Sequence, residues 1–86
     1  MTLQEFLSYS IYDQYAIIME LGTHVADRHD GYSNIKLYMI DSFYAEVFSR
    51  VKDGIIWKFG GFDHPVLLQP YLEQVDIQHL LQSDSI

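Results

Sequence analysis

Cysteine is absent from the chain, which excludes a disulfide framework and any chemistry that needs a thiolate. Positive charge is also scarce, because five lysine and arginine residues stand against 12 aspartate and glutamate residues, for a net charge of −7. The cations are dispersed rather than clustered: Arg28, Lys36, Arg50, Lys52 and Lys58. Since a surface of that sign repels phosphate backbones and anionic headgroups, we expect neither nucleic acid nor a membrane as a partner.

Long apolar runs are missing as well. No stretch reaches the roughly 18 apolar residues that a membrane-spanning helix needs. The segment MTLQEFLSYS has neither the basic start nor the apolar core of a secretory signal. We therefore expect a cytoplasmic location.

Motifs that would support catalysis or bind a cofactor are also missing. The pair Gly60-Gly61 lacks the later glycine and the helix start of a dinucleotide-binding loop, and no glycine-rich phosphate loop occurs. No serine has a histidine and an acid in a recognised local pattern. We predict a protein that is not an enzyme and has no cofactor and no metal.

The composition indicates one folded unit. The chain has 86 residues, of which 49% are hydrophobic and 15% aromatic. It is too short to divide into two useful cores and too apolar for a disordered chain. We predict a single domain over residues 1–86.

Two helices are predicted at the start of the chain. Thr2 and Glu5 have the spacing of a capping box, which predicts a helix over residues 3–8. Ser10 precedes a second helix over residues 11–21, and Gly22 is expected to end it in the left-handed conformation. The apolar face of this second helix consists of Ile11, Tyr15, Ile18 and Met19.

From Gly22 to Phe62 the hydrophobic period is nearer two, which is typical of strands. Breaks at Asp30-Gly31, Asp41-Ser42 and Asp53-Gly54 divide this region into a four-stranded antiparallel meander. We place the strands at residues 23–28, 33–40, 43–51 and 55–61.

The C-terminal region is predicted to contain short helices. Asp63 is expected to cap a helix that begins near Pro65, and Pro70 to interrupt it and restart the chain as a turn through residues 71–73. Asp76 is expected to cap a last helix over residues 77–82, before a frayed tail at residues 83–86. The predicted fold is α+β: two N-terminal helices, a four-stranded antiparallel meander, and one or two short C-terminal helices packed on one face of the sheet.

The turns decide which side chains share a face of the sheet. A two-residue turn at Asp41-Ser42 pairs Ile40 with Phe43, which gives one face without charge except at its end. That face consists of Tyr38, Ile40, Phe43, Ala45 and Val47. A three-residue loop over 52–54 would pair Val51 with Ile55, Ser49 with Trp57 and Val47 with Phe59, adding Trp57 and Phe59 to it. A two-residue loop at Asp53-Gly54 would instead move Trp57 and Phe59 to the other face.

We expect the helices to cover the uncharged face, so the opposite face is predicted to be exposed. The candidate binding residues there are Leu37, Met39, Tyr44, Glu46, Phe48 and Ile56. Burying each such apolar side chain is worth about 1.5–3 kcal/mol, so leaving them in water suggests an interface with another protein or with a second copy in a homodimer. Cross-strand pairing on an ordinary solvated face is the alternative. A small-molecule cleft is less favoured because a flat sheet lacks concavity.

The polar run from His24 to Asp30 resembles a metal site only superficially. On a regular strand His24 points away from Asp27 and His29, so these side chains would not converge on one ion. Glu46, between Tyr44 and Phe48, is the one carboxylate whose pKa a covering partner would raise. An acid–base enzyme or ligand-binding protein using Glu46 or residues 24–30 is therefore the alternative function. A third is an acidic partner of a neighbouring protein, in the manner of an immunity protein or antitoxin.

Most of the chain resembles a group of small uncharacterised bacterial proteins. The segment LYMIDSFYAEVF (37–48) fits their pattern LYxxDxFYxEV, and LLQPYLEQVDI (67–77) fits their pattern PYLExxDI. The segment LGTHVADR (21–28) resembles the one that precedes the sheet in these proteins. The resemblance implies a compact single domain, often encoded as a stand-alone protein, and no known activity. Ser42 departs from the pattern, which has glycine there, and serine tolerates positive φ poorly.

Overall fold

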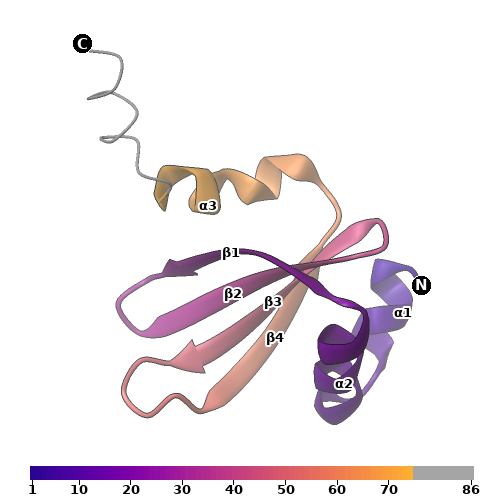
Figure 1. Ribbon diagram of the computed structural model, residues 1–86, viewed down its shortest axis with the longest axis horizontal. Helices are drawn as coiled ribbons and strands as arrows, with labels where there is room; N and C mark the ends of the chain where they lie inside the picture. The colour runs from indigo at the N-terminus through magenta and orange to yellow at the C-terminus, as the bar shows by residue number, and fades with distance from the viewer. Residues whose placement is uncertain (75–86) are drawn as a thin grey trace.

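The computed structural model describes residues 1–74 and has the predicted α+β fold (Figure 1). Its elements, in chain order, are α1 (Leu3–Ser8), α2 (Ile11–Leu21), β1 (Thr23–His29), β2 (Ser33–Ile40), β3 (Phe43–Arg50), β4 (Ile56–Phe62), the 3-10 helix η1 (Pro65–Leu68) and α3 (Gln69–Gln74). The predicted cap at Asp76, the helix over 77–82 and the tail at 83–86 lie outside the described residues.

Side-chain caps start both N-terminal helices where they were predicted. Thr2 Oγ1 accepts from the Glu5 amide at 3.1 Å while the Glu5 carboxylate accepts from the Thr2 amide, and Ser10 Oγ accepts from the amide of Asp13 at 3.2 Å. Gly22 ends α2 in an extended conformation, with φ −81°, so the predicted left-handed cap is wrong. Glycine is needed here for space, because a Cβ atom would lie 2.5 Å from the Ile18 carbonyl oxygen.

The sheet is an antiparallel meander with strand order β1-β2-β3-β4. The predicted register of the β2–β3 hairpin is confirmed: Ile40 pairs with Phe43, and the pairing continues to Ser33 and Arg50. Asp41 takes the left-handed position of this turn, with φ 51°, and Ser42 does not have to adopt positive φ. The departure from glycine at Ser42 therefore leaves the two-residue turn intact.

The register of the last hairpin differs from the prediction in one place. Val47 pairs with Phe59 as predicted, but Ser49 pairs with Ile56, and Trp57 is the extra residue of a β-bulge. The Arg50 amide donates to the Ile55 carbonyl at 2.9 Å, so a four-residue loop over 51–54 replaces the predicted three-residue loop. Because one inserted residue reverses the alternation, Ile56 and Trp57 lie on faces opposite to those predicted.

Helices cover both faces of the sheet. Helices α1 and α2 cover one face. The core on that face consists of Phe6, Ile18, Ile40, Phe43, Ala45 and Val47. On the other face, Tyr71 of α3 and Leu68 of η1 pack on a second core of Ile35, Leu37, Phe48 and Phe62. The expectation that this second face is uncovered is therefore wrong.

The C-terminal helices cover the sheet because Pro70 does not interrupt them. η1 passes directly into α3, and Pro70 lies in the first turn of α3, where its missing amide hydrogen has no intrahelical acceptor to satisfy. The helix carries Tyr71 onto the sheet, where only 4% of its surface stays exposed. The predicted cap Asp63 is also wrong, since His64 Nδ1 accepts from the Val66 amide at 3.2 Å. Within residues 1–74, no helix is long and apolar enough to cross a membrane.

Candidate functional site

Helix α2 carries two apolar stripes, and only one of them is buried. Ile18 lies fully in the core and Ile17 packs against it. The second stripe is turned outward and consists of Ile11, Tyr12, Tyr15 and Met19. Tyr12 is 82% exposed and Ile11 60% exposed, although each belongs to a residue type that is usually more buried. The exposed stripe is the feature of α2 that packing within residues 1–74 does not explain.

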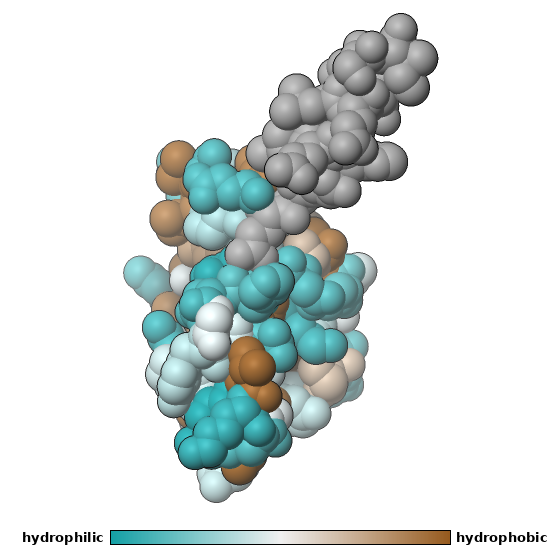
Figure 2. All heavy atoms as spheres, turned by 90° about the vertical axis from the view of Figure 1, so that its left-hand side faces the viewer, coloured by the Kyte–Doolittle hydropathy of each residue, from teal (hydrophilic) through white to brown (hydrophobic). Residues whose placement is uncertain are grey.

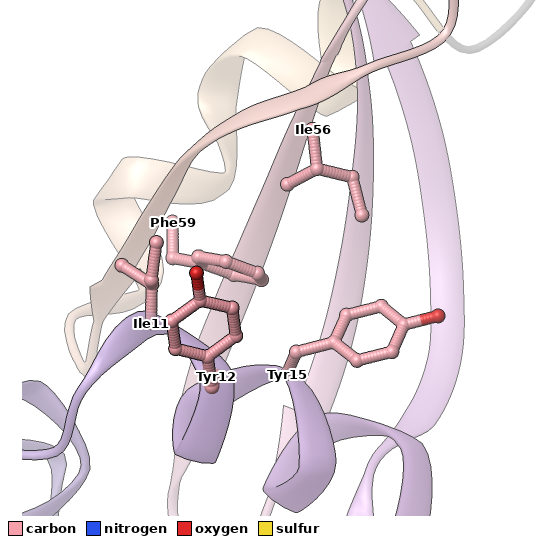
Figure 3. A pocket seen from close by; sticks show the side chains of 5 residues that line it. All are labelled: Ile11, Tyr12, Tyr15, Ile56 and Phe59. Carbon is pink, nitrogen blue, oxygen red and sulfur yellow. The ribbon is translucent and has the colours of Figure 1, made fainter.

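The outward stripe of α2 forms one wall of a groove. A hollow of about 280 Å³ lies between Ile11, Tyr12 and Tyr15 on the helix and Ile56 and Phe59 on β4. Figure 3 shows these side chains reaching toward the gap from the helix and from the strand. The rings of Tyr15 and Phe59 meet edge to face, with centroids 6.4 Å apart.

A second hollow of about 280 Å³ continues the first along α2. It shares Tyr15 and Ile56 with the first hollow, adds Met19 from α2, and reaches Lys36 and Ser49 on the neighbouring strands. We call the continuous surface of Ile11, Tyr12, Tyr15, Met19, Ile56 and Phe59 the α2 groove. The hairpin end of the molecule, seen in Figure 2, is mainly hydrophilic with scattered apolar atoms. The α2 groove is therefore a local apolar surface beside a polar one.

The residues predicted for the binding face are distributed over three environments. Leu37 and Phe48 are buried, and Tyr44 is half-buried with its ring stacked on Phe62 at 5.3 Å. Met39 is exposed at the β2 end of this face. Ile56 is on the opposite face, in the α2 groove, as a result of the bulge at Trp57. Of the predicted set, the structure therefore brings only Ile56 to the groove.

Glu46 lies beneath α3 in a polar network. Its Oε2 atom accepts from Tyr71 Oη at 2.7 Å and from Arg28 Nη2 at 3.3 Å. The Arg28 guanidinium also lies 5.1 Å from the centre of the Tyr71 ring, at cation–π distance. Burial, and then the neighbouring Glu46 carboxylate, raise the pKa of the Tyr71 hydroxyl. The contacts of Glu46 therefore attach α3 to the sheet.

Arg28 is not fully satisfied in this network. Its Nε atom is buried and has no hydrogen-bond partner among residues 1–74. The guanidinium has five N–H donors in a fixed plane, so a site that satisfies Nη2 and holds the group over the Tyr71 ring need not satisfy Nε. Glu46, Tyr71 and the Phe48 ring, which lies 6.0 Å from the guanidinium, enclose Arg28. We assign it to the attachment of α3.

The polar run on β1 is arranged differently from the prediction. A bulge at Val25 turns His24 and Asp27 to the same side, and His24 Nε2 lies 2.8 Å from Asp27 Oδ1. The prediction that these two side chains point apart is therefore wrong. Both are well exposed at the edge of the sheet. In the part of the chain that the structure describes, no three histidine, aspartate or glutamate side chains lie close enough together to hold a metal ion.

The α2 groove was missed because the outward and inward stripes of α2 had been merged. Ile11, Tyr15 and Met19 follow at steps of four residues and were assigned to the core together with Ile18. At 100° per residue, Met19 is turned 100° from Ile18 and cannot share its contacts. Gln14, buried with its amide donating to the Tyr9 carbonyl at 3.0 Å, lies on the inner side. The apolar residues of α2 span a wider arc than a single buried face requires. That width is the sequence signal for a second, exposed stripe.

No protein-family model, no curated protein and no solved structure matches the chain. The function has to be inferred from the side chains, their exposure and their charge.

Proposed function

We propose that this protein is a non-enzymatic protein-binding domain whose partner docks in the α2 groove. The observation that carries the proposal is the exposure of the outward stripe of α2 directly beside the exposed Ile56 of β4. Grooves lined by aromatic and aliphatic side chains are the usual sites at which proteins accept apolar anchors of a partner.

Energetics support a partner at this position. Covering an exposed side chain of this size is worth about 1.5–3 kcal/mol, and the groove presents several of them together. A domain of 86 residues buries a limited share of its surface and has a small margin of stability. Apolar side chains retained outside such a small core favour a role in binding.

The composition of the groove supports a non-enzymatic role. Neither hollow is lined by a carboxylate or an imidazole, and the ionisable groups there are tyrosine phenols and the amine of Lys36. His24 Nε2 lies 2.8 Å from Asp27 Oδ1, but both side chains are exposed at the sheet edge and neither lines the two hollows of the groove. Binding rather than turnover is the activity this arrangement supports.

The α2 groove takes the place of the sheet face that was predicted to bind a partner, because the central residues of that face are buried. Leu37 and Phe48 lie under α3 and are not accessible in this arrangement. Met39 remains exposed on that face, so it provides a matched comparison with Tyr12. Two exposed apolar residues on opposite faces can each be given the same charge.

The test compares the wild-type protein with the variants Tyr12→Glu and Met39→Glu. Each is used to capture a partner, and the mass of each purified complex is measured by light scattering. We expect Tyr12→Glu to lose the complex and Met39→Glu to keep it, because only the first places a charge in the α2 groove. Loss with Met39→Glu alone would assign binding to the opposite face. If the wild-type protein is a monomer and both variants recover the same partner as the wild type, the proposal is wrong.

A further inference from the structure

Lys36 is the one charged residue within residues 1–74 that lines the two hollows of the α2 groove. A third hollow, of about 250 Å³, begins at the same lysine and at Ser49. Its polar lining residues are Asp27, Arg28, His29, Asn34, Lys36 and Ser49. The three hollows therefore form one trough on this face of the sheet, apolar at β4 and polar toward β1.

Strand pairing gives the direction of the trough. Lys36 lies opposite Val47, and Val47 lies opposite Phe59, so the three form one row across β2, β3 and β4. Neighbouring strands are about 4.8 Å apart, which separates the two ends of this row by about 10 Å. Helix α2 runs the same way, because Tyr12 near its start lines the hollow at Phe59 and Met19 near its end lines the hollow at Lys36.

The charge of Lys36 is available to a partner. Within residues 1–74 its ammonium group forms no ion pair and no hydrogen bond. Asp27, directly opposite on β1, has its Oδ1 atom 2.8 Å from His24 Nε2 instead. Asn34 lines the third hollow together with Lys36, two residues before it on the same face of β2. An anion at Lys36 can therefore also accept a hydrogen bond from the Asn34 amide.

The carboxylates of α2 lie away from the groove. At 100° per residue, Asp13 and Glu20 are about 160° and 140° around the helix from Tyr15, which lines both hollows. At physiological ionic strength, exposed charges more than about 8 Å apart are largely screened from each other. The field inside the groove is therefore set by Lys36 rather than by the net charge of −7.

The sheet leaves room for one helix beside α2. The outermost row of side chains on this face, formed by His29, Asn34, Ser49 and Ile56, lies beyond the core residues that α2 covers. Successive rows on one face are about 6.6 Å apart, and helices pack side by side at about 8–10 Å. Figure 1 shows α1 and α2 at one end of the sheet, with the β1–β2 and β3–β4 loops extending beyond them. A helix next to α2 would rest on the uncovered row and follow the trough.

We propose that the partner in the α2 groove is a helix that pairs a carboxylate with Lys36 and places its apolar side chains against Tyr12, Tyr15 and Ile56. This inference rests on the proposed function and adds the chemistry of the partner. Helix residues seven apart lie on the same side, about 10.5 Å along the axis, which matches the distance between Lys36 and the β4 end. A second copy of α2 fits less well, because its acids lie away from its apolar stripe.

Three synthetic peptides of about 17 residues test the inference, since that length gives a helix of about 25 Å. All have blocked ends and carry leucine at the same amphipathic spacing among alanine and glutamine. They differ only at two positions, seven residues before and seven residues after the central leucine, which are glutamate, glutamine or lysine. One of these two positions reaches Lys36 whichever way the helix lies in the groove.

Binding of the fluorescent peptides to the full chain is measured by anisotropy at physiological ionic strength. We expect the glutamate peptide to bind about two- to fivefold more tightly than the glutamine peptide, which is the range of a partly exposed ion pair. We expect the lysine peptide to bind no more tightly than the glutamine peptide. The net charge of −7 favours the opposite order, so the sign of the preference reports the local charge.

Matched variants assign the preference to one side chain. Lys36→Gln should make the affinities for the glutamate and glutamine peptides equal, and Lys36→Glu should make the lysine peptide the tightest of the three. Lys58→Gln is the control, because it makes the same change of charge on the opposite face, where Lys58 lies 4.7 Å from the centre of the Phe48 ring. It should keep the glutamate preference. Tyr12→Ala should weaken all three peptides about tenfold.

The outcomes separate this inference from the proposed function. Equal affinity for the glutamate and glutamine peptides, weakened in Tyr12→Ala, would overturn the carboxylate and keep a protein-binding groove. A glutamate preference that persists in Lys36→Gln, or tightest binding of the lysine peptide to the wild type, would overturn it as well. Binding that Tyr12→Ala does not change would place the site elsewhere and overturn it. Binding of none of the peptides would also overturn it, while capture with Tyr12→Glu tests the groove independently.

Discussion

Tyr71 Oη donates a 2.7 Å hydrogen bond to Glu46 Oε2, which joins α3 to the middle of β3. Helix α3 has only six residues, and a helix of that length is not stable alone in water. Its position therefore depends on contacts with the sheet, of which the buried Tyr71 ring and this hydrogen bond are the central ones.

Tyr71→Phe removes the hydroxyl and keeps the ring. Glu46 retains its contact with Arg28 but loses a donor in a half-buried site, so we expect the free energy of unfolding to fall by about 1–2 kcal/mol. Urea unfolding followed by the fluorescence of Trp57, whose ring lies 5.9 Å from that of Phe48, measures the change. A variant as stable as the wild type would mean that the hydrogen bond contributes nothing to holding α3.

The same hydroxyl predicts how stability depends on alkaline pH. Its pKa is raised above the ordinary value of 10.0, so the folded state holds this proton more tightly than the unfolded state. The corresponding stabilisation is complete below pH 10.0 and is lost as the pH rises toward the folded-state pKa. We expect a fall in the free energy of unfolding above that pH that is smaller in Tyr71→Phe. Identical slopes in the two proteins would contradict this.

Asp30 predicts the behaviour in acid. Its Oδ1 atom accepts from the amides of Ser33 at 2.7 Å and Tyr32 at 3.0 Å, and these bonds lower its pKa below the ordinary 3.8. The stabilisation is therefore present above pH 3.8 and is lost as the pH falls through the folded-state pKa. We expect Asp30→Asn to be less stable than the wild type at neutral pH and the difference to shrink below pH 3.8. An undiminished difference in acid would rule out the charge as its cause.

A buried and an exposed aromatic side chain of the N-terminal helices should respond differently to truncation. Phe6 is fully buried against Phe43, with ring centroids 5.4 Å apart, so Phe6→Ala should cost about 3–5 kcal/mol. Tyr12→Ala should change the free energy of unfolding by less than about 0.5 kcal/mol, since the side chain is exposed. Thermal and urea unfolding of both variants measure this contrast. A large loss in Tyr12→Ala would mean that the outward stripe serves stability rather than binding.

Local chemistry was enough to predict most of the fold. The caps at Thr2 and Ser10 each depend on residues three positions apart, and a two-residue turn at Asp41-Ser42 fixes every pair of β2 and β3. In all three cases the deciding contacts lie within a few residues of sequence. For that reason the predicted bounds of α1 and α2 and the predicted β2–β3 register agree with the structure.

The candidate site depended on features that local patterns do not specify. The bulges at Val25 and Trp57 each insert one residue, which exchanges faces without changing hydrophobic composition. The covering of Leu37 and Phe48 depends on Tyr71, more than 20 residues away in sequence. Neither a bulge nor a long-range contact leaves a periodic signal. Ile56 is therefore predicted on the wrong face, and the C-terminal helices are predicted over the uncharged face rather than over Leu37 and Phe48.

Amide NMR spectra of the full chain, recorded with and without the partner protein recovered by capture, locate the binding surface residue by residue. We expect the largest shifts at Tyr12, Tyr15 and Ile56, on the two walls of the α2 groove. Shifts centred on Met39, Tyr44 and Lys58, with the groove unchanged, would place binding on the opposite face and contradict this expectation.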